Sequence, residues 1–293
     1  MQNSDILSLL SKDDRDGVLK YFFPADASMS LLSHLLKRLI ISKSIDIPFS
    51  QVVVSRDEEH GKPCYAASPA LGKSVSFNVS HQAGMVALLA IPQQGNKEEF
   101  DVGVDVVFPN ERGELDRILR ERNKRQAFDD FVEMHSEVFS PHEISALKLP
   151  SSGRDAEEWL EEEITHRLRQ FYALWCLREA YVKMTGEALL AEWLQELEFR
   201  HYPVPFPTPE AWEEGRVGNP HQKDGPLAWE GEYEMWFKGR KVEGVECGIV
   251  GVGSRFMVAR AVRRKDKGKV DVVWSKLEEV SVEDVAKRCR EAL

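Results

Sequence analysis

The run Trp175-Cys-Leu-Arg-Glu-Ala-Tyr-Val-Lys183 decides the fold that we expect for this chain. Glu179 and Lys183 stand at i and i+4, so in a helix they share one face. Gly186 fits the end of that helix, and Ser152-Gly-Arg-Asp155 offers a cap for its start. The sequence therefore predicts a long helix that presents a carboxylate and an ammonium together. On its own, such a pair would more simply be a surface salt bridge.

A second acidic residue stands in the apolar run Val102-Gly-Val-Asp-Val-Val107, which predicts a strand over 101–107. A carboxylate is costly to bury unpaired, so Asp105 should either bind a cation or accept backbone hydrogen bonds. A structural aspartate at the end of a strand is the alternative for this run alone.

Two further runs carry polar groups at turns. Ser80 and His81 lie in Phe77-Asn-Val-Ser-His-Gln82, at the end of a predicted strand, and His60-Gly-Lys-Pro63 forms a turn that contains Lys62. Adjacent side chains on a strand point to opposite faces, so His81 cannot deprotonate Ser80 as in a serine hydrolase. The sequence also lacks the Gly-x-Ser-x-Gly elbow. A structural histidine is the other interpretation of His81.

In this order, the runs around Lys62, His81, Asp105 and Glu179 resemble the signature motifs of the 4′-phosphopantetheinyl transferases, in particular the large surfactin-synthetase type. The resemblance covers roughly residues 11–200 and is strongest from 171 to 190. The long insertion between Asp105 and Glu179 and the helix motif resemble those of fungal members. It implies an α+β fold with two pseudo-symmetric α/β halves and an active site in the cleft between them. The small trimeric carrier-protein synthases share the motifs but are far shorter.

The resemblance also implies the chemistry. Members transfer the phosphopantetheine arm of coenzyme A to a serine of a carrier protein and use Mg²⁺. Asp105 and Glu179 would hold the metal, Glu179 is a candidate base for the serine hydroxyl, and Lys183 would neutralise the pyrophosphate. These three residues form the expected catalytic set. We expect the two carboxylates to face each other across one cleft, bordered by Lys183, His81 and Lys62.

The expected coenzyme A contacts follow from the same resemblance. Ser80 and His81 would hold the 3′-phosphate, with Lys62 near the nucleotide. Ser28-Met29 replaces a basic pair of the family, and Lys20 and Arg38 are expected to substitute for it in part.

Other departures from the family pattern concern the metal shell, the helix motif and the N-terminus. Val107 stands where many members have a third metal carboxylate, so water would complete the shell. Arg178 replaces the usual lysine, which keeps the charge but changes its geometry. The chain begins inside what should be the first helix, so we expect the first strand of the family to be missing.

Composition limits the remaining possibilities. The chain has 293 residues, of which 42% are hydrophobic and 30% charged, as in a globular protein with a sizeable core. A net charge of −10 argues against a general nucleic-acid binder. No apolar run is long enough for a membrane span, no secretory signal is visible, and the four cysteines have no paired spacing. We therefore expect a cytoplasmic monomer.

An acidic carrier protein would need a basic or apolar docking patch on this acidic chain. His34, Lys37, Arg38 and Lys43, on one predicted helix, are candidates, and an ordinary solvated helix face is the alternative.

The order of the expected elements suggests an N-terminal half, 1–100, and a C-terminal half, 101–293, and the resemblance implies that the second half carries the metal site. We expect loop insertions near 108–165 and 203–228. Helices are expected at 5–20, 29–43, 125–138, 141–148, about 155–185 and 282–292; strands are expected at 50–56, 74–79, 85–91, 101–107, 229–237, 241–247 and 256–262.

The function that we expect is therefore the transfer of phosphopantetheine from coenzyme A to acyl- or peptidyl-carrier domains of polyketide, nonribosomal peptide, fatty acid or lysine-pathway enzymes. Two alternatives remain open from the sequence. One is a degenerate relative that binds coenzyme A or a carrier protein without catalysis. The other is a metal-dependent nucleotide hydrolase, which would turn over without a carrier protein.

Overall fold

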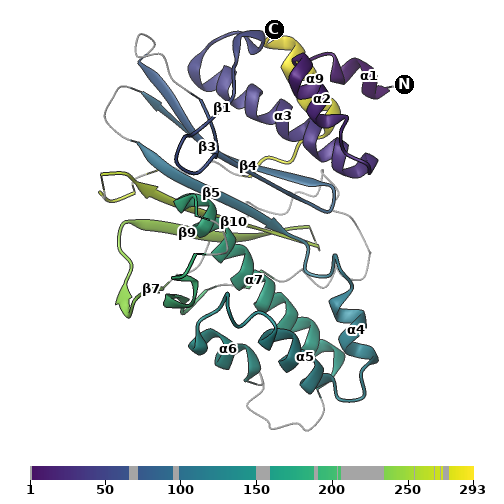
Figure 1. The fold of residues 1–293 in the computed structure, drawn as a ribbon, viewed down its shortest axis with the longest axis vertical. Coiled ribbons are helices and arrows are strands. Elements are labelled where there is room, and N and C mark those ends of the chain that lie inside the picture. The colour runs from purple at the N-terminus through teal and green to yellow at the C-terminus, as the bar shows by residue number, and fades with distance from the viewer. Residues whose placement is uncertain are drawn as a thin grey trace.

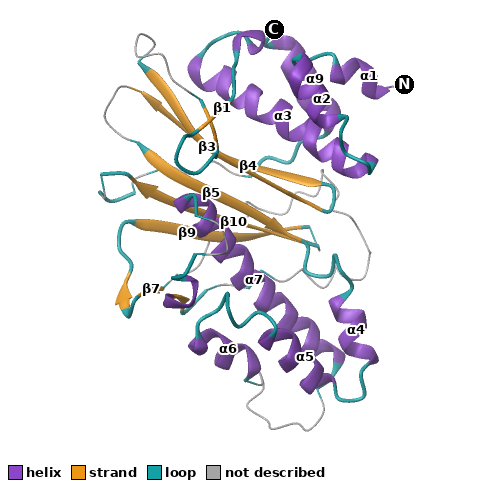
Figure 2. Ribbon diagram, in the orientation of Figure 1, coloured by secondary structure: helices purple, strands orange, loops and turns teal. Residues whose placement is uncertain are grey.

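The structure is a computed structural model. It describes residues 2–65, 72–94, 99–149, 159–187, 191–202, 204–205, 234–253, 255–266, 268–270, 272 and 277–293. Strands lie between two groups of helices, with both termini in the same group (Figure 1; Figure 2). The expected α+β class is confirmed.

In the first half, a long helix covers an antiparallel hairpin of strands. Strand β3 (Lys73–Gln82) pairs with β4 (Met85–Gln94), and helix α3 (Pro24–Ile45) packs on both. Ile41 and Ile45 lie one helical turn apart and bury against Val75 and other apolar residues of this layer. The remaining elements of this half are α1 (Gln2–Leu7), α2 (Lys12–Val18), the 3₁₀ turn η1 (Phe49–Gln51), β1 (Ser55–Arg56) and β2 (Pro63–Cys64).

The second half repeats this arrangement with another long helix. Strand β10 (Phe256–Arg264) lies between β5 (Phe100–Val107) and β9 (Val245–Val252), antiparallel to both. Helix α7 (Glu161–Thr185) packs across β5 and β10. It ends at Gly186, whose φ of 89° is left-handed, as its sequence position predicts. Each half is thus a long helix on an antiparallel sheet.

Gly103 allows α7 to pack directly on β5. A Cβ atom at this position would lie 2.0 Å from the carbonyl oxygen of Ala180 and 2.4 Å from the amide nitrogen of Met184. Only a residue without a side chain permits this approach. The approach brings the turns of α7 that carry Glu179 and Lys183 next to the strand that carries Asp105.

The segment 108–165, expected as an insertion, contains three helices in its described part before α7 begins at Glu161. They are α4 (Glu114–Arg120), which the sequence analysis did not expect, α5 (Lys124–Glu133) and α6 (Pro141–Lys148). Helix α6 begins where its sequence predicts, because Ser140 and Glu143 form a capping box. A small sheet beside them consists of β6 (Leu197–Phe199), β7 (Met235–Phe237) and β8 (Arg240–Lys241), after the 3₁₀ turn η3 (Leu194–Glu196).

The last helix, α9 (Val282–Glu291), returns to the first half of the chain. Val285 and Cys289 are buried with Leu35 and other residues of α1 to α3, and Figure 1 shows α9 beside these helices. A division at residue 100 therefore separates strands β1 to β4 from the later strands, but it does not separate α9 from the first half. The proposed domain boundary stays a prediction.

Other expected elements differ in their bounds. The helix predicted at 5–20 is two helices, because Ser11 caps the start of α2. In the stretch 50–56, only the last two residues are strand. Most of the loop predicted at 203–228, and the start proposed for the long helix, lie outside the described residues. None of the described helices is long and apolar enough to cross a membrane.

Candidate functional site

Asp105, Ser80 and Lys183 are joined pairwise by three hydrogen bonds. Asp105 is 5% exposed, and its Oδ1 accepts hydrogen bonds from Lys183 Nζ at 2.5 Å and from Ser80 Oγ at 2.8 Å. Lys183 Nζ also donates to Ser80 Oγ at 2.8 Å. Strand β5, helix α7 and strand β3 each contribute one of these residues. The site therefore forms where the two halves meet.

Side chains of β3 link it to β5, although the two strands share no backbone ladder. Alternate residues of β3 point to one face, and each one from Ser76 to Gln82 bonds to β5 or to the residue just after it. Ser76 Oγ donates to the carbonyl of Phe100, Asn78 Oδ1 accepts from the amide of Val104, and Gln82 Oε1 accepts from the amide of Phe108. Ser80 is the member of this row that reaches a carboxylate. Asn78 and Gln82 were missed in the sequence, although the period-two pattern of β3 could have indicated them.

Glu179 lies one turn before Lys183 on α7 and within electrostatic range of Asp105. Burial raises the pKa of Glu179, the charge of Asp105 raises it further, and Lys183 partly opposes the shift. Its carboxylate makes no hydrogen bond or ion pair with the part of the chain that the structure describes. Asp105 and Glu179 are therefore within electrostatic range of each other, and that they face each other across one cleft stays a prediction.

This donor set fits a hard divalent cation that is shared with a phosphate substrate. Mg²⁺ is typically held by one or two carboxylates together with substrate phosphates and waters. Among the described residues, no group of three or more His, Cys, Asp or Glu side chains is arranged to hold a metal by itself. Asp105 and Glu179 supply hard oxygen ligands, and the ammonium of Lys183 on Asp105 shows that a cation is favoured there.

His81 lies on the opposite face of β3 from Ser80 and is exposed. Loss of hydration lowers the pKa of His81, and the cations Lys183 and Lys37 lower it further, while Asp26 opposes them. The imidazole has no hydrogen bond or ion pair within the described ranges. His81 therefore lies between the Asp105 site and helix α3, in a cationic environment.

Lys62 closes the C-terminal end of α7. Its Nζ donates to the carbonyl of Met184 at 3.1 Å, and burial lowers its pKa, partly opposed by Asp101 and Asp57. Asp101, which acts on Lys62, is near the start of β5, whereas Asp105 is near its end. Lys62 therefore lies beside the C-terminal end of α7, next to the carbonyl of Met184.

The two remaining sequence candidates lie in the first half. Arg38, on α3, donates to Asp14 through Nε at 3.1 Å and also contacts Asp14 and the carbonyl of Val52 through its terminal nitrogens. Lys20 follows α2 and is exposed. Arg38 is therefore committed to α2 and the segment after η1.

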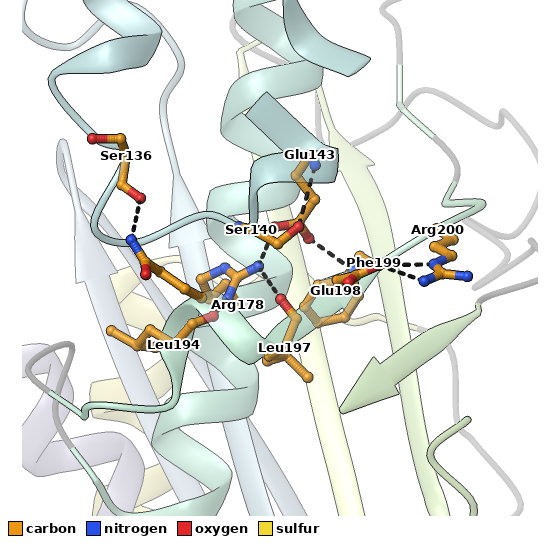
Figure 3. Close-up of polar contacts among 10 residues, drawn as sticks. Ser136, Ser140, Glu143, Arg178, Leu194, Leu197, Glu198, Phe199 and Arg200 are labelled. Atoms are coloured by element: carbon orange, nitrogen blue, oxygen red, sulfur yellow. Dashed lines mark hydrogen bonds and ion pairs between the residues drawn. The ribbon is translucent and has the colours of Figure 1, made fainter. Parts of the chain in front are cut away.

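Arg178, the departure from the helix motif, lies in the core beside Glu143, Leu194 and Leu197 (Figure 3). It is fully buried, and its Nη2 donates to Glu143 Oε2 at 2.6 Å and to the carbonyl of Leu197 at 2.8 Å. Its Nη1 donates to the carbonyl of Leu194 at 2.5 Å. Glu143 also accepts from the amide of Phe199 at 2.7 Å. Only a guanidinium offers donors in this forked arrangement, so a lysine would lose part of the network.

Comparison with known protein families agrees with this geometry. Residues 2–93 match the family model described as "4'-phosphopantetheinyl transferase, N-terminal", and residues 101–232 match "4'-phosphopantetheinyl transferase superfamily". The boundary between the two matches coincides with the junction at which the Asp105 site forms.

Three fungal proteins are similar over most of their length. 4'-Phosphopantetheinyl transferase 1 of Fusarium mangiferae is 38% identical over 91% of this chain and 80% of its own. The 4'-phosphopantetheinyl transferase of Aureobasidium melanogenum is 36% identical over 89% and 84%, and NpgA of Emericella nidulans is 32% identical over 88% and 76%. Neither alternative function is supported by these similarities. The chain belongs to the 4′-phosphopantetheinyl transferase family, enzymes that use coenzyme A as substrate, act on carrier-protein domains and generally depend on a metal.

Proposed function

We propose that this chain transfers the phosphopantetheine arm of coenzyme A to a serine of apo carrier domains, with Mg²⁺ as the metal. The observation that carries the proposal is the convergence of Asp105 and Glu179, with Lys183 bound to Asp105 at 2.5 Å. Two carboxylates within electrostatic range of each other are unfavourable without a cation, and this supports a metal-assisted reaction. When bound, the metal would neutralise charge on the pyrophosphate of coenzyme A.

The residues of the chain account for the proton and the leaving group. The serine oxygen of the carrier forms a bond to the phosphorus of the phosphopantetheine phosphate, and the pyrophosphate P–O bond breaks. Glu179 is the candidate to accept the serine proton, because its raised pKa lies closer to neutral pH than that of an ordinary glutamate. Lys183 would stabilise the charge on the leaving phosphate of adenosine 3′,5′-bisphosphate. Most of the acceleration would come from positioning and charge stabilisation.

We assign different roles to Ser80 and His81, which were expected to hold the 3′-phosphate together. The hydroxyl of Ser80 bonds to Asp105 on one face of β3, while His81 lies on the other face. Ser80 would therefore orient Asp105 and Lys183, and His81 would bind the 3′-phosphate. The roles proposed for Lys62, Arg38 and Lys20 in nucleotide binding remain predictions.

We further propose that the carrier substrates are acyl- or peptidyl-carrier domains of polyketide, nonribosomal peptide, fatty acid or lysine-pathway enzymes. A monomeric state and a cytoplasmic setting remain predictions from the sequence. The fungal relatives support a role in activating carrier domains, but they do not select one of these classes.

The test is direct. The purified chain is incubated with coenzyme A, Mg²⁺ and an apo carrier domain, and the carrier is measured by intact mass spectrometry. We expect a gain of one phosphopantetheine on the carrier, which should be absent when its acceptor serine is replaced by alanine. A carrier that stays unmodified while coenzyme A is cleaved would instead support the nucleotide hydrolase.

A further inference from the structure

The turn between α2 and α3 exposes a run of large apolar side chains. Leu19, Tyr21, Phe22 and Phe23 are 66%, 49%, 89% and 61% exposed. Among the described residues, nine large apolar side chains are exposed, and these four lie within five consecutive positions. We call these four residues the apolar turn. A contiguous apolar surface of this kind on a folded chain marks a place where another molecule binds.

The backbone of the apolar turn is ordered, so its side chains are held at the surface. The amide of Tyr21 donates to the carbonyl of Val18 at 3.4 Å, and Val18 itself is 2% exposed. The amide of Ala27 donates to the carbonyl of Phe23 at 3.1 Å, because α3 begins directly after this residue. The rings of Phe22 and Phe23 pack edge to face, with centroids 5.0 Å apart. The protein therefore presents both rings on a fixed backbone and buries neither of them.

Two contacts place the apolar turn beside the reaction site. The sulfur of Met29 on α3 accepts a hydrogen bond from the amide of Gly84 at 3.2 Å, so the start of α3 lies against the turn that joins β3 to β4. Asp26 is within electrostatic range of His81, and His81 is within range of Lys183. The apolar turn ends three positions before Asp26, which is about 5 Å along a helix. It therefore forms part of the edge that the first half provides to the site.

The basic docking patch that the sequence predicted on α3 is largely engaged within the protein. The side chain of Arg38 donates to Asp14, and His34 Nδ1 lies 3.2 Å from Asp14 Oδ1. Lys37 is only 9% exposed, and Lys43 lies near the far end of the helix. The surface that α3 offers beside the site is therefore the apolar turn rather than a basic stripe.

We propose that the apolar turn is a docking surface for the apo carrier domain and contacts apolar side chains beside the acceptor serine. The proposal rests on the function proposed above, in which the carrier brings a serine to Asp105 and Glu179. A domain of about 80 residues has a radius of gyration of about 12 Å. A carrier whose serine reaches the two carboxylates therefore extends over the edge at which the apolar turn lies.

Charge also favours an apolar contact with this partner. The chain has a net charge of −10, so an acidic carrier is repelled by the protein as a whole. Residues 19–25 contain a single charged residue, Lys20, which is positive and exposed. The apolar turn therefore lets the two proteins bury apolar area without placing like charges together.

The test removes the two rings together, as Phe22→Ser with Phe23→Ser, and uses an apo carrier domain that the wild-type chain modifies. Both rings are exposed, so the double variant should fold normally, which thermal unfolding checks. We expect the KM for the carrier to rise about 20-fold, while kcat and the KM for coenzyme A change by less than about twofold. Leucine at both positions keeps apolar area and should retain most of the affinity.

Leu149→Ser is the matched control, because Leu149 is 64% exposed at the end of α6, and it should change none of these constants. Binding of a carrier whose acceptor serine is replaced by alanine, measured by calorimetry, provides a readout that does not need turnover. We expect the double variant to weaken this binding and to leave the binding of adenosine 3′,5′-bisphosphate unchanged.

An unchanged KM for the carrier, or an equal rise in the KM for coenzyme A, would overturn the proposal. It would also be overturned by a wild-type dimer in analytical ultracentrifugation that the double variant abolishes, because the apolar turn would then bind a second copy of the chain. If the double variant fails to fold, Phe22→Ser alone should raise the KM for the carrier about fivefold, and no rise would count against the proposal. A wild-type chain that modifies no carrier domain would instead refute the proposed function.

Discussion

Helix α7 carries two ion pairs that differ in how completely their groups are satisfied. Arg178 and Glu143 are 0% and 2% exposed, and four backbone groups bond to them in the network of Figure 3. Lys183 lies little more than one turn further along α7 and pairs with Asp105 of β5. On the same helix, Glu179 has no hydrogen bond or ion pair with the described residues. The first pair faces the core of the second half, while the second pair faces the first half.

The first ion pair stabilises the packing of the core, whereas we propose that the second belongs to the reaction site. Around Arg178, the buried carboxylate and both terminal guanidinium nitrogens are bonded; only Nε has no partner in the described structure. Such a network fixes the packing of α6, η3 and β6 on α7. Around Asp105, burial and then the charge of Asp105 raise the pKa of Glu179, and Lys183 opposes this shift only in part. Perturbed, unpaired groups in a partly open place are typical of sites that bind ligands.

The largest effect on activity is expected from Glu179→Gln. The change keeps the shape and removes a proposed metal ligand and base. We expect transfer to fall by about 1,000-fold, which is ~4 kcal/mol of transition-state stabilisation. Stability should be equal or higher, because the folded protein disfavours the charge of Glu179. Intact-mass assays and thermal unfolding measure the two effects, and a loss smaller than about tenfold would contradict both proposed roles.

Gly103→Ala should damage both regions, because it separates α7 from β5. The added methyl would meet backbone atoms at 2.0 and 2.4 Å, and backbone cannot move aside as a flexible side chain can. We expect a loss of about 3 kcal/mol in the free energy of unfolding, measured by denaturant titration. Gly17→Ala is the control, because a Cβ at this position of α2 meets nothing within 4 Å and its φ is not left-handed, so this variant should lose no stability. A fully stable Gly103→Ala variant would refute the close packing.

Arg178→Lys should affect stability and not chemistry. Lysine keeps one positive charge, but its donors sit on a single nitrogen and do not match the two terminal nitrogens that bond to Glu143 and two carbonyls, so we expect a loss of about 2 kcal/mol. Transfer per folded molecule, measured well below the unfolding temperature, should stay within about twofold of the wild type. If activity fell while stability was unchanged, the two ion pairs would not be functionally distinct.

The smallest effect is expected from Ser80→Ala. The hydroxyl bonds to both Asp105 and Lys183, so its removal should loosen the site without removing any charge. We expect a decrease in kcat of about tenfold, equivalent to ~1.4 kcal/mol, with little change in KM for coenzyme A. Ser145→Ala removes a hydroxyl on the exposed face of α6 and should leave the rate unchanged. A selective rise in the KM for coenzyme A would restore Ser80 to the phosphate site.

The sequence by itself determined the family, the long helix that ends at Gly186 and the strand around Asp105. These features follow from local periodicity, caps and short motifs, which depend on neighbouring residues. The sequence did not predict helix α4 or the packing of α9 against the first half. Both depend on contacts between segments that are distant in the chain.

Tertiary structure alone decided which polar groups meet. Ser80 and Asp105 are distant in sequence, and only the packing of β3 beside β5 makes the hydroxyl a partner of the carboxylate rather than of a phosphate. The same holds for Arg178, which local sequence places on α7 and the fold joins to Glu143. The burial of Lys37 depends on what α3 packs against. Local sequence specifies which face of an element a side chain occupies, but the partner across that face is set by long-range packing.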